Sequence, residues 1–197
     1  MRWLFRILPL ALVLALGLAV VGSRSLPDRR TLERSTVIEA PVDAVFDRLA
    51  RIRKWSGWYL PPGEGQFEGP ELGAGGTLVV AAPEDGAQRR LRLVSTSSVP
   101  PMEVVYTFPD VDQLPYEIEG RFELEPADGG TKVRSSQSLR SRAAEDDWMA
   151  RTGERWFLSI MADRFVGSIL DRELQNLKAA AEGRPVPAAP GPARAPQ

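Results

Sequence analysis

The order of local patterns constrains this chain most. A strand and a short helix in residues 33–58 open a folded region, and a long amphipathic helix in residues 154–182 closes it. Between them, apolar and polar residues mostly alternate with the period-2 spacing of strands. This order predicts an α+β domain in which a curved antiparallel sheet wraps around the closing helix, a shell that usually encloses an apolar cavity.

The opening segment predicts a strand followed by a helix. Residues 32–39 favour a strand, with β-branched Val37 and Ile38 near its end. Pro41 suits the first position of a helix. The apolar residues after it share one helical face: Val42, Val45, Phe46, Leu49 and Ile52.

The middle of the chain predicts strands joined by tight turns. The expected strands are residues 77–82, 90–97, 102–108, 116–125 and 132–140. Residues 83–88 and 127–130 are typical of hairpin turns. Along 116–125 the acidic residues alternate with apolar ones and are expected to face solvent, so paired carboxylates for glycosidase-like chemistry are not expected there.

The closing segment changes to the 3.6-residue period of a helix. Its apolar stripe comprises Trp156, Phe157, Ile160, Met161, Phe165, Ile169, Leu170, Leu174 and Leu177. Charged residues, Glu173 among them, are expected to cover the remaining surface. Gly183 and Pro185 end the helix, and the Pro/Ala-rich residues 184–197 are expected to be a disordered tail.

Composition excludes several kinds of site. The chain has 197 residues with no histidine and no cysteine, so a Ser-His-Asp triad, a histidine-ligated zinc site, disulfides and thiolate chemistry are excluded. Its net charge of −1 gives no field to recruit nucleic acid, which is not an expected partner. No cofactor and no metal are expected. The acids of residues 144–148 suit a helix cap better than a hard cation.

An apolar run precedes the predicted domain. Residues 3–22 are about long enough to cross a hydrocarbon core as a helix. The run is interpreted as an uncleaved transmembrane anchor in residues 1–22, with a secretory signal cleaved near Gly22 or Ser23 as the alternative. Residues 23–30 then form a linker and residues 31–183 the domain. The domain is expected on the extracytoplasmic side of the membrane, or secreted if the signal is cleaved.

Two segments carry a resemblance to a known family. The first contains Ser35, Ile38, Ala40-Pro41 and Val45-Phe46, followed by Trp55 and Trp58; the second is the end of the closing helix, DRELQNLKAAAE. Over residues 33–182 the chain resembles the START-like or Bet v 1-like (SRPBCC) superfamily, and specifically its bacterial polyketide cyclase/dehydrase-like proteins. The resemblance implies a helix-grip fold around a cavity for lipids, sterols, polyketides or quinones. The matched positions are structural, so no catalytic residue is assigned.

The strand phases and the helical stripe define an expected cavity lining. From the strands it comprises Leu91, Leu93, Ser95, Val104, Tyr106, Phe108, Tyr116, Ile118, Phe122, Ser135, Gln137 and Leu139. From the closing helix it comprises Trp156, Ile160, Met161, Phe165 and Ile169. A filled core with satisfied polar groups is the alternative. Trp55, Trp58 and Tyr59 form either a lid over the cavity mouth or the packing beneath the short helix.

Three functions follow from these observations. The leading hypothesis is a membrane-anchored domain that binds a hydrophobic small molecule or lipid. The second is a cyclase/dehydrase-type enzyme, which without histidine needs Tyr106, Tyr116 or a buried acid as proton donor. The strand phases place the carboxylates outside the shell, which favours binding over catalysis. The third is an accessory domain that contacts an envelope protein; its protein partners are not specified by the sequence.

Overall fold

The computed structural model describes residues 24–60, 65–84, 87–109, 115–144 and 146–187, together with Gly17, Val21 and Gly22; for residues 81–91 the backbone alone is described. Most of the predicted anchor and the last ten residues of the predicted tail therefore lie outside the described residues. Among the residues that are described, no helix is both long enough and apolar enough to span a membrane.

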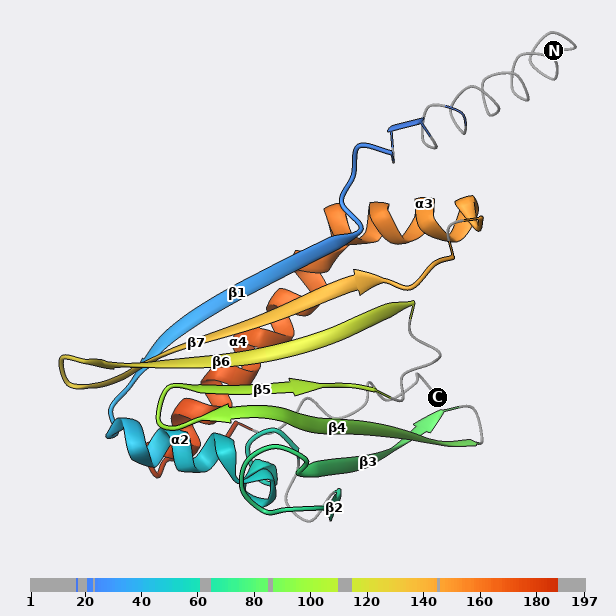
Figure 1. Cartoon of the computed structure of the whole chain (residues 1–197). Coiled ribbons are helices and arrows are strands. Elements are labelled where there is room, and N and C mark those ends of the chain that lie inside the picture. The colour runs from blue at the N-terminus through green and yellow to red at the C-terminus, as the bar shows by residue number, and fades with distance from the viewer. Residues whose placement is uncertain are drawn as a thin grey trace, which may run out of the picture.

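A seven-stranded antiparallel sheet forms one wall of the molecule (Figure 1). Its strands are β1 (Arg29–Ile38), β2 (Gln66–Glu68), β3 (Thr77–Glu84), β4 (Ala87–Val99), β5 (Glu103–Thr107), β6 (Tyr116–Ala127) and β7 (Gly130–Ser141). Their order in space is β1-β7-β6-β5-β4-β3-β2. The first and the last strand along the chain, β1 and β7, therefore pair with each other, as a helix-grip fold requires.

The helices cover one face of this sheet. The short helix α2 (Val42–Ala50) and the 3₁₀ turn η1 (Ile52–Trp55) lie at one end. The closing helical region runs without a break through α3 (Trp148–Trp156), the π-helical segment η2 (Phe157–Met161) and α4 (Ala162–Ala181). In Figure 1 α4 crosses behind β1, β7 and β6 and ends near α2, which confirms the curved sheet around a long terminal helix.

The closing region differs from the prediction in two ways. It begins at Trp148 rather than near Glu154, because Asp147 caps it: the Asp147 carboxylate accepts a hydrogen bond of 3.0 Å from the Ala150 amide. The acids of residues 144–148 thus include a helix cap, as their position suggested. The π-helical segment was not predicted; its extra residue per turn changes which side chains face the sheet.

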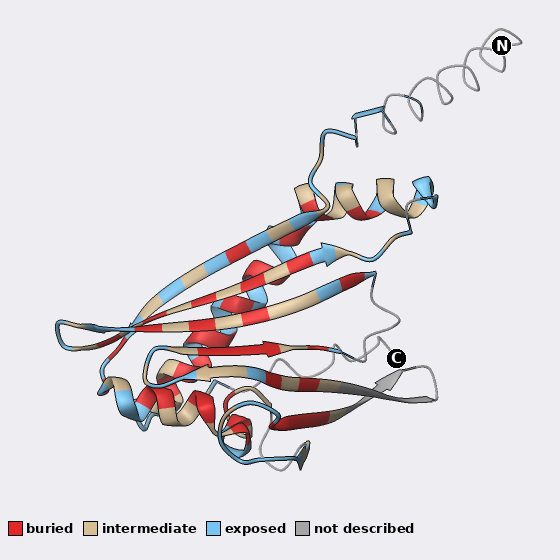
Figure 2. Cartoon of the chain, viewed as in Figure 1, coloured by how far each residue is buried: buried red, intermediate tan, exposed pale blue. Residues whose placement is uncertain are grey.

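The alternation expected for the strands is confirmed. Figure 2 shows buried residues alternating with less buried ones along β6 and β7. The outward residues pair across strands, as in the ion pairs Glu117–Arg140 and Glu123–Arg134. Two boundaries differ: β1 starts at Arg29, inside the predicted linker, and the short strand β2 was not predicted.

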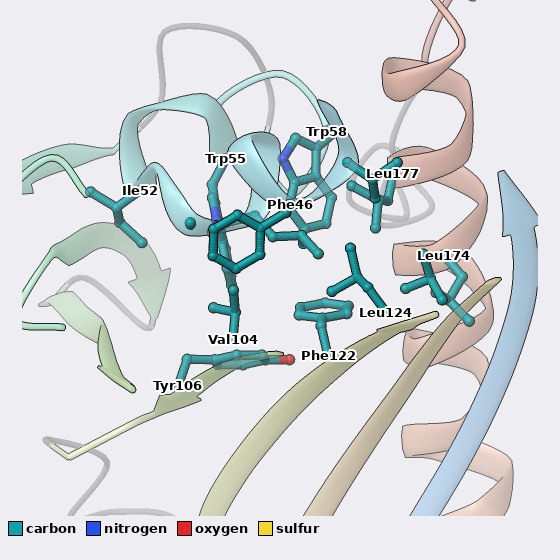
Figure 3. Close-up of a cluster of buried hydrophobic side chains, with 14 of the residues drawn as sticks. Phe46, Ile52, Trp55, Trp58, Val104, Tyr106, Phe122, Leu124, Leu174 and Leu177 are labelled. Carbon is teal, nitrogen blue, oxygen red and sulfur yellow. Dashed lines mark hydrogen bonds between the residues drawn. The ribbon is translucent and has the colours of Figure 1, made fainter. Parts of the chain in front are cut away.

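Two apolar clusters fill the space between sheet and helices. The larger one lies beneath α2 and η1 and reaches Leu174 and Leu177 at the end of α4 (Figure 3). The smaller one lies beneath η2 and the first half of α4, where Leu158, Val166 and Leu170 pack on Leu32 and Leu139. Ile118 of β6 packs against both clusters.

Candidate functional site

A row of inward-facing residues crosses the sheet where the two clusters meet. Strand pairing aligns Ser95 of β4, Tyr106 of β5, Gly120 of β6, Gln137 of β7 and Leu32 of β1. Residues directly opposite one another on antiparallel strands present their side chains to the same face. Three polar side chains are therefore placed on the covered face of the sheet.

Gly120 allows the Tyr106 ring to lie across the sheet. A Cβ atom at Gly120 would stand 2.0 Å from Cζ of Tyr106, far inside van der Waals contact. Because Gly120 has no side chain, the Tyr106 ring occupies that space. Figure 3 shows the Tyr106 hydroxyl oxygen pointing along the sheet toward α4. There Oη accepts a hydrogen bond from Nε2 of Gln137 at 3.4 Å.

Glu173 of α4 completes a buried polar cluster with Tyr106 and Gln137. Its Oε1 accepts from the same Gln137 Nε2 at 3.4 Å, and the residue is only 6% exposed. The prediction that Glu173 belongs to the polar cover of the closing helix is therefore wrong. It follows that a carboxyl group lies inside the shell, contrary to the expectation from the strand phases, because the acid comes from the helix.

Burial dominates the protonation of this cluster. Desolvation raises the pKa of Glu173 to about 8, an effect partly offset by hydrogen bonding from Tyr59. Desolvation, followed by the charge of Glu173, also raises the pKa of Tyr106 and that of Tyr59 well above 10. At neutral pH Glu173 is thus mainly protonated and both phenols keep their protons.

A second buried glutamate, Glu154, has hydrogen-bond donors for its carboxylate. Glu154 of α3 is 8% exposed and accepts from the Ser141 hydroxyl and, at 3.3 Å, from the Ala143 amide. Its backbone carbonyl accepts from the Tyr116 hydroxyl at 3.4 Å. Burial, followed by the charge of Glu154, raises the pKa of Tyr116 to about 12. Glu154 and Tyr116 therefore fasten α3 to the sheet.

The cluster around Glu173 is incomplete by comparison. Oε2 of Glu173 has no hydrogen-bond partner among the described residues, and the same holds for the hydroxyls of Ser95 and Ser135. A buried polar atom without a partner costs about 1–3 kcal/mol. Such atoms gathered on one inner face indicate a place where water or a ligand supplies the missing partners.

An apolar strip on α4 leads from solvent to this cluster. Met161, the last residue of η2, is followed at four-residue spacing by Phe165, Ile169 and Glu173 of α4, and we call the first three the α4 flank. Phe165 is 52% and Ile169 50% exposed, whereas Glu173 at the end of the series is buried. Phe165 stacks on Phe157, which stacks on Tyr116 of β6, so the flank borders the inner face of the sheet.

The closing-helix residues of the predicted lining are not enclosed, and their part in a ligand site stays a prediction. Five residues expected in an enclosed interior are substantially exposed: Trp156, Ile160, Met161, Phe165 and Ile169. The helix rests on β1 and β7 through Leu158, Ala162, Val166 and Leu170 instead. On its β1 side, Arg34 forms ion pairs with Asp163 and Asp171, which holds α4 at that edge of the sheet. The broad apolar stripe thus divides into a buried face and an exposed flank.

The strand residues of the predicted lining lie on the covered face. Ile118 is half-buried, the side chain of Leu91 lies outside the described residues, and the others are buried: Leu93, Ser95, Val104, Tyr106, Phe108, Tyr116, Phe122, Ser135, Gln137 and Leu139. Whether they enclose a ligand stays a prediction. A cavity of about 360 Å³ is lined by Phe108 and Ile118 of this set, but its other walls are mainly outward-facing groups such as Arg29, Glu119 and Arg140.

The aromatic residues after α2 belong to the core. Trp55 and Trp58 are 0% and 1% exposed and lie between η1 and the sheet (Figure 3). Trp55 contacts Tyr106 edge-on, with ring centroids 5.2 Å apart, and its indole donates to the Leu49 carbonyl at 2.7 Å. Both indoles therefore pack beneath the short helix, as the second of the two alternatives has it. Tyr59 is half-buried beside them.

Glu173 is the site residue that the sequence reasoning missed. The sequence contains a pattern that points to Glu173, because this residue continues the four-residue series Phe157, Met161, Phe165 and Ile169. Its charge placed it with the solvent-facing residues instead. The described residues contain no group of three or more acids placed to hold a metal ion.

Solved structures similar to this chain share its fold. A protein from Chromobacterium violaceum, CV1439, is 19% identical with a TM-score of 0.53, covering 77% of this chain and 96% of its own. Ara h 8.0201 is 18% identical with a TM-score of 0.53, covering 79% and 99%. The di-domain aromatase/cyclase StfQ of the steffimycin biosynthetic pathway is 16% identical with a TM-score of 0.59, covering 82% of this chain and 53% of its own. At these identities the likeness shows the fold alone.

No curated protein matches the chain. A family model does: the one described as polyketide cyclase / dehydrase and lipid transport matches residues 29–182, which include every strand and helix described above. With that match over most of its length, and with a curved antiparallel sheet around a long closing helix, the chain belongs to this family of the SRPBCC superfamily.

Proposed function

We propose that this protein binds a hydrophobic small molecule or lipid between the sheet and α4, with the ligand's polar group at the Tyr106–Gln137–Glu173 cluster. The observation that carries the proposal is the set of partnerless buried polar atoms at the inner end of an exposed apolar flank. Ligand sites combine apolar walls with a few convergent polar groups of this kind. The family description, which names lipid transport, supports the same class of ligand.

Native mass spectrometry of the full chain released from lipid nanodiscs tests this proposal. The expected result is a mass adduct of one small apolar molecule, displaced by adding an excess of a hydrophobic competitor such as a naphthalene. Substituting Phe165→Ser on the flank should weaken retention, whereas Leu72→Ser, at an exposed site between β2 and β3, should not. Persistent absence of an adduct, together with no naphthalene binding, would reject the proposal.

We further propose that residues 1–22 anchor the protein, with the domain on the extracytoplasmic side. The support is the length and hydropathy of the apolar run, which includes a single arginine, Arg6, near its start. An anchor would keep the binding site near a membrane, the source of hydrophobic ligands. Secretion after cleavage near Gly22 is the alternative.

A cyclase/dehydrase-type enzyme is the second candidate function. It is favoured by one observation, the protonated carboxyl of Glu173 buried beside a tyrosine, because acid–base catalysis needs a group that exchanges protons near the working pH. Turnover of an apolar polycarbonyl substrate, lost in Glu173→Gln, would favour this candidate. Binding without turnover would favour the first.

A further inference from the structure

The hydrogen-bond directions within the buried cluster determine what it can offer a ligand. Nε2 of Gln137 is a donor, so Oη of Tyr106 and Oε1 of Glu173 both act as acceptors toward it. In a protonated carboxyl whose Oε1 accepts, Oε2 carries the proton. Oε2 has no partner among the described residues, and the Tyr106 hydroxyl proton has no acceptor there. The cluster therefore contains two unused donors.

We propose that Tyr106 and protonated Glu173 together bind the carbonyl oxygen of an apolar ligand, with Gln137 holding both donors in place. This inference rests on the proposed binding function and names the chemical class of its ligand. A carbonyl oxygen has two lone pairs and no proton, so it accepts from both donors at once. A phenol beside a neutral carboxyl is a donor pair that enzymes use for this purpose.

The surroundings of Glu173 favour a neutral ligand over a charged one. The groups that face it are Tyr59 after η1, Tyr106 on β5 and Gln137 on β7, all neutral at pH 7. None of the ion pairs found among the described residues includes Glu173. A ligand carboxylate would enter this apolar site without a counterion, at a large desolvation cost. Burial supports the required protonation, since it raises the pKa of Glu173 to about 8.

A pair of probes with the same shape tests this proposal. 2-Acetylnaphthalene carries a carbonyl group, and 2-ethylnaphthalene replaces it with a methylene. Binding of each to the full chain in nanodiscs is measured at pH 6, with empty nanodiscs subtracted. The protein should bind the ketone more tightly, by about fivefold for each donor that contributes. The infrared carbonyl stretch of ¹³C-labelled ketone should fall to lower frequency on binding.

Two variants that each remove one buried hydroxyl separate the proposed role from a general effect on stability. Tyr106→Phe should lose about fivefold of the ketone preference and return the carbonyl stretch toward its value in empty nanodiscs. Thr131→Val removes a buried hydroxyl that donates to the Ala40 carbonyl instead, so it should change neither readout. Raising the pH from 6 to 9 should lower the preference of the wild type about fivefold, because Glu173 loses its proton while Tyr106 keeps its own. In Glu173→Gln, whose amide keeps a donor, the preference should persist.

The possible failures are distinguishable. If neither naphthalene binds, the proposed binding function is wrong. If both bind equally well to the wild type, or if Tyr106→Phe behaves like Thr131→Val, the binding site stands and the carbonyl proposal is overturned.

Discussion

At the scale of single residues, the two buried glutamates show how context decides the role of an acid. Glu154 has donors from Ser141 and Ala143, so its burial stabilises the junction of α3 with β7. Glu173 accepts a long hydrogen bond from Gln137 and is also hydrogen-bonded by Tyr59, but its Oε2 has no partner among the described residues. A group that costs folding free energy in this way is a candidate for function rather than for stability.

The stability of the protein should depend on pH through Glu173. Its pKa in the folded state, about 8, lies above the ordinary value of 4.5, so the folded state binds the proton more tightly. The stabilisation that this proton gives the folded state is therefore complete below pH 4.5. The free energy of unfolding then falls by roughly a few kcal/mol in all as the pH rises to about 8. Urea unfolding between pH 5 and 9 should show this decline, and Glu173→Gln should largely remove it. Parallel curves for the two proteins would contradict the prediction.

Gly120 should be intolerant of a side chain. In Gly120→Ala the new Cβ meets the Tyr106 ring and must displace it, which should lower the free energy of unfolding by about 1–3 kcal/mol and weaken ketone binding. Chemical denaturation measures the first effect. Gly153→Ala is the control, because its Cβ meets open space in α3; it should leave stability unchanged or raise it by about 0.5–1 kcal/mol. Equal effects at the two sites would be evidence against the packing of Tyr106 over Gly120.

At the scale of elements, α4 has two apolar faces with different tasks. One packs Leu170 and its neighbours onto β1 and β7, and the ion pairs of Arg34 with Asp163 and Asp171 lie along the same edge. The other is the α4 flank, which remains exposed beside the inner face of β6. A helix held at one edge of a curved sheet can fill the core with one face and leave the next face for a ligand.

Adjacent substitutions on α4 should separate these tasks. Leu170→Ala removes a fully buried side chain and should cost about 2–5 kcal/mol in the free energy of unfolding. Ile169→Ala, one residue away and half exposed, should cost far less but should weaken binding of an apolar probe. Thermal unfolding and naphthalene titration measure the two effects. If Ile169→Ala left binding unchanged, the flank would have no part in the site.

At the scale of the whole molecule, ion pairs between distant parts of the chain hold the N-terminal end of the domain. β1 begins seven residues after Gly22, and Asp28 just before it pairs with Arg151 and Arg155 of α3. The hydrogen bond from Arg155 is the main cause of the lowered pKa of Asp28. The start of the sheet is thereby fastened to the closing helix at the end of the domain that meets the leader.

Membrane association should depend on the leader. The full chain should sediment with membranes and resist extraction at alkaline pH, and its intact mass should include residues 1–22, because about 20 apolar residues suffice to span the hydrocarbon core. A chain lacking residues 2–22 should be released. A mature protein whose mass lacks about 22 N-terminal residues would favour secretion after cleavage instead.

Much of the fold could be predicted from local pattern. The alternation in residues 116–125 and 132–140 gave the inward phase of β6 and β7, and Ala40-Pro41 marked the change from strand to helix. Period-2 and period-3.6 patterns report which side of an element is apolar, and the order of elements then limits the topology. Gln137 and Tyr106 were placed on the covered face by the same reasoning.

The sequence alone therefore determined the fold class, the phases of the strands and the absence of histidine and cysteine chemistry. Tertiary structure decided which half of the apolar stripe on α4 is buried, that Trp55 and Trp58 belong to the core, and that Glu173 faces Gln137. The physical reason is that a helical pattern wider than one face does not specify which part meets the sheet. That choice depends on the π-helical segment, on the ion pairs of Arg34 and on the position of β1 at the edge, and these arise only when distant parts of the chain meet.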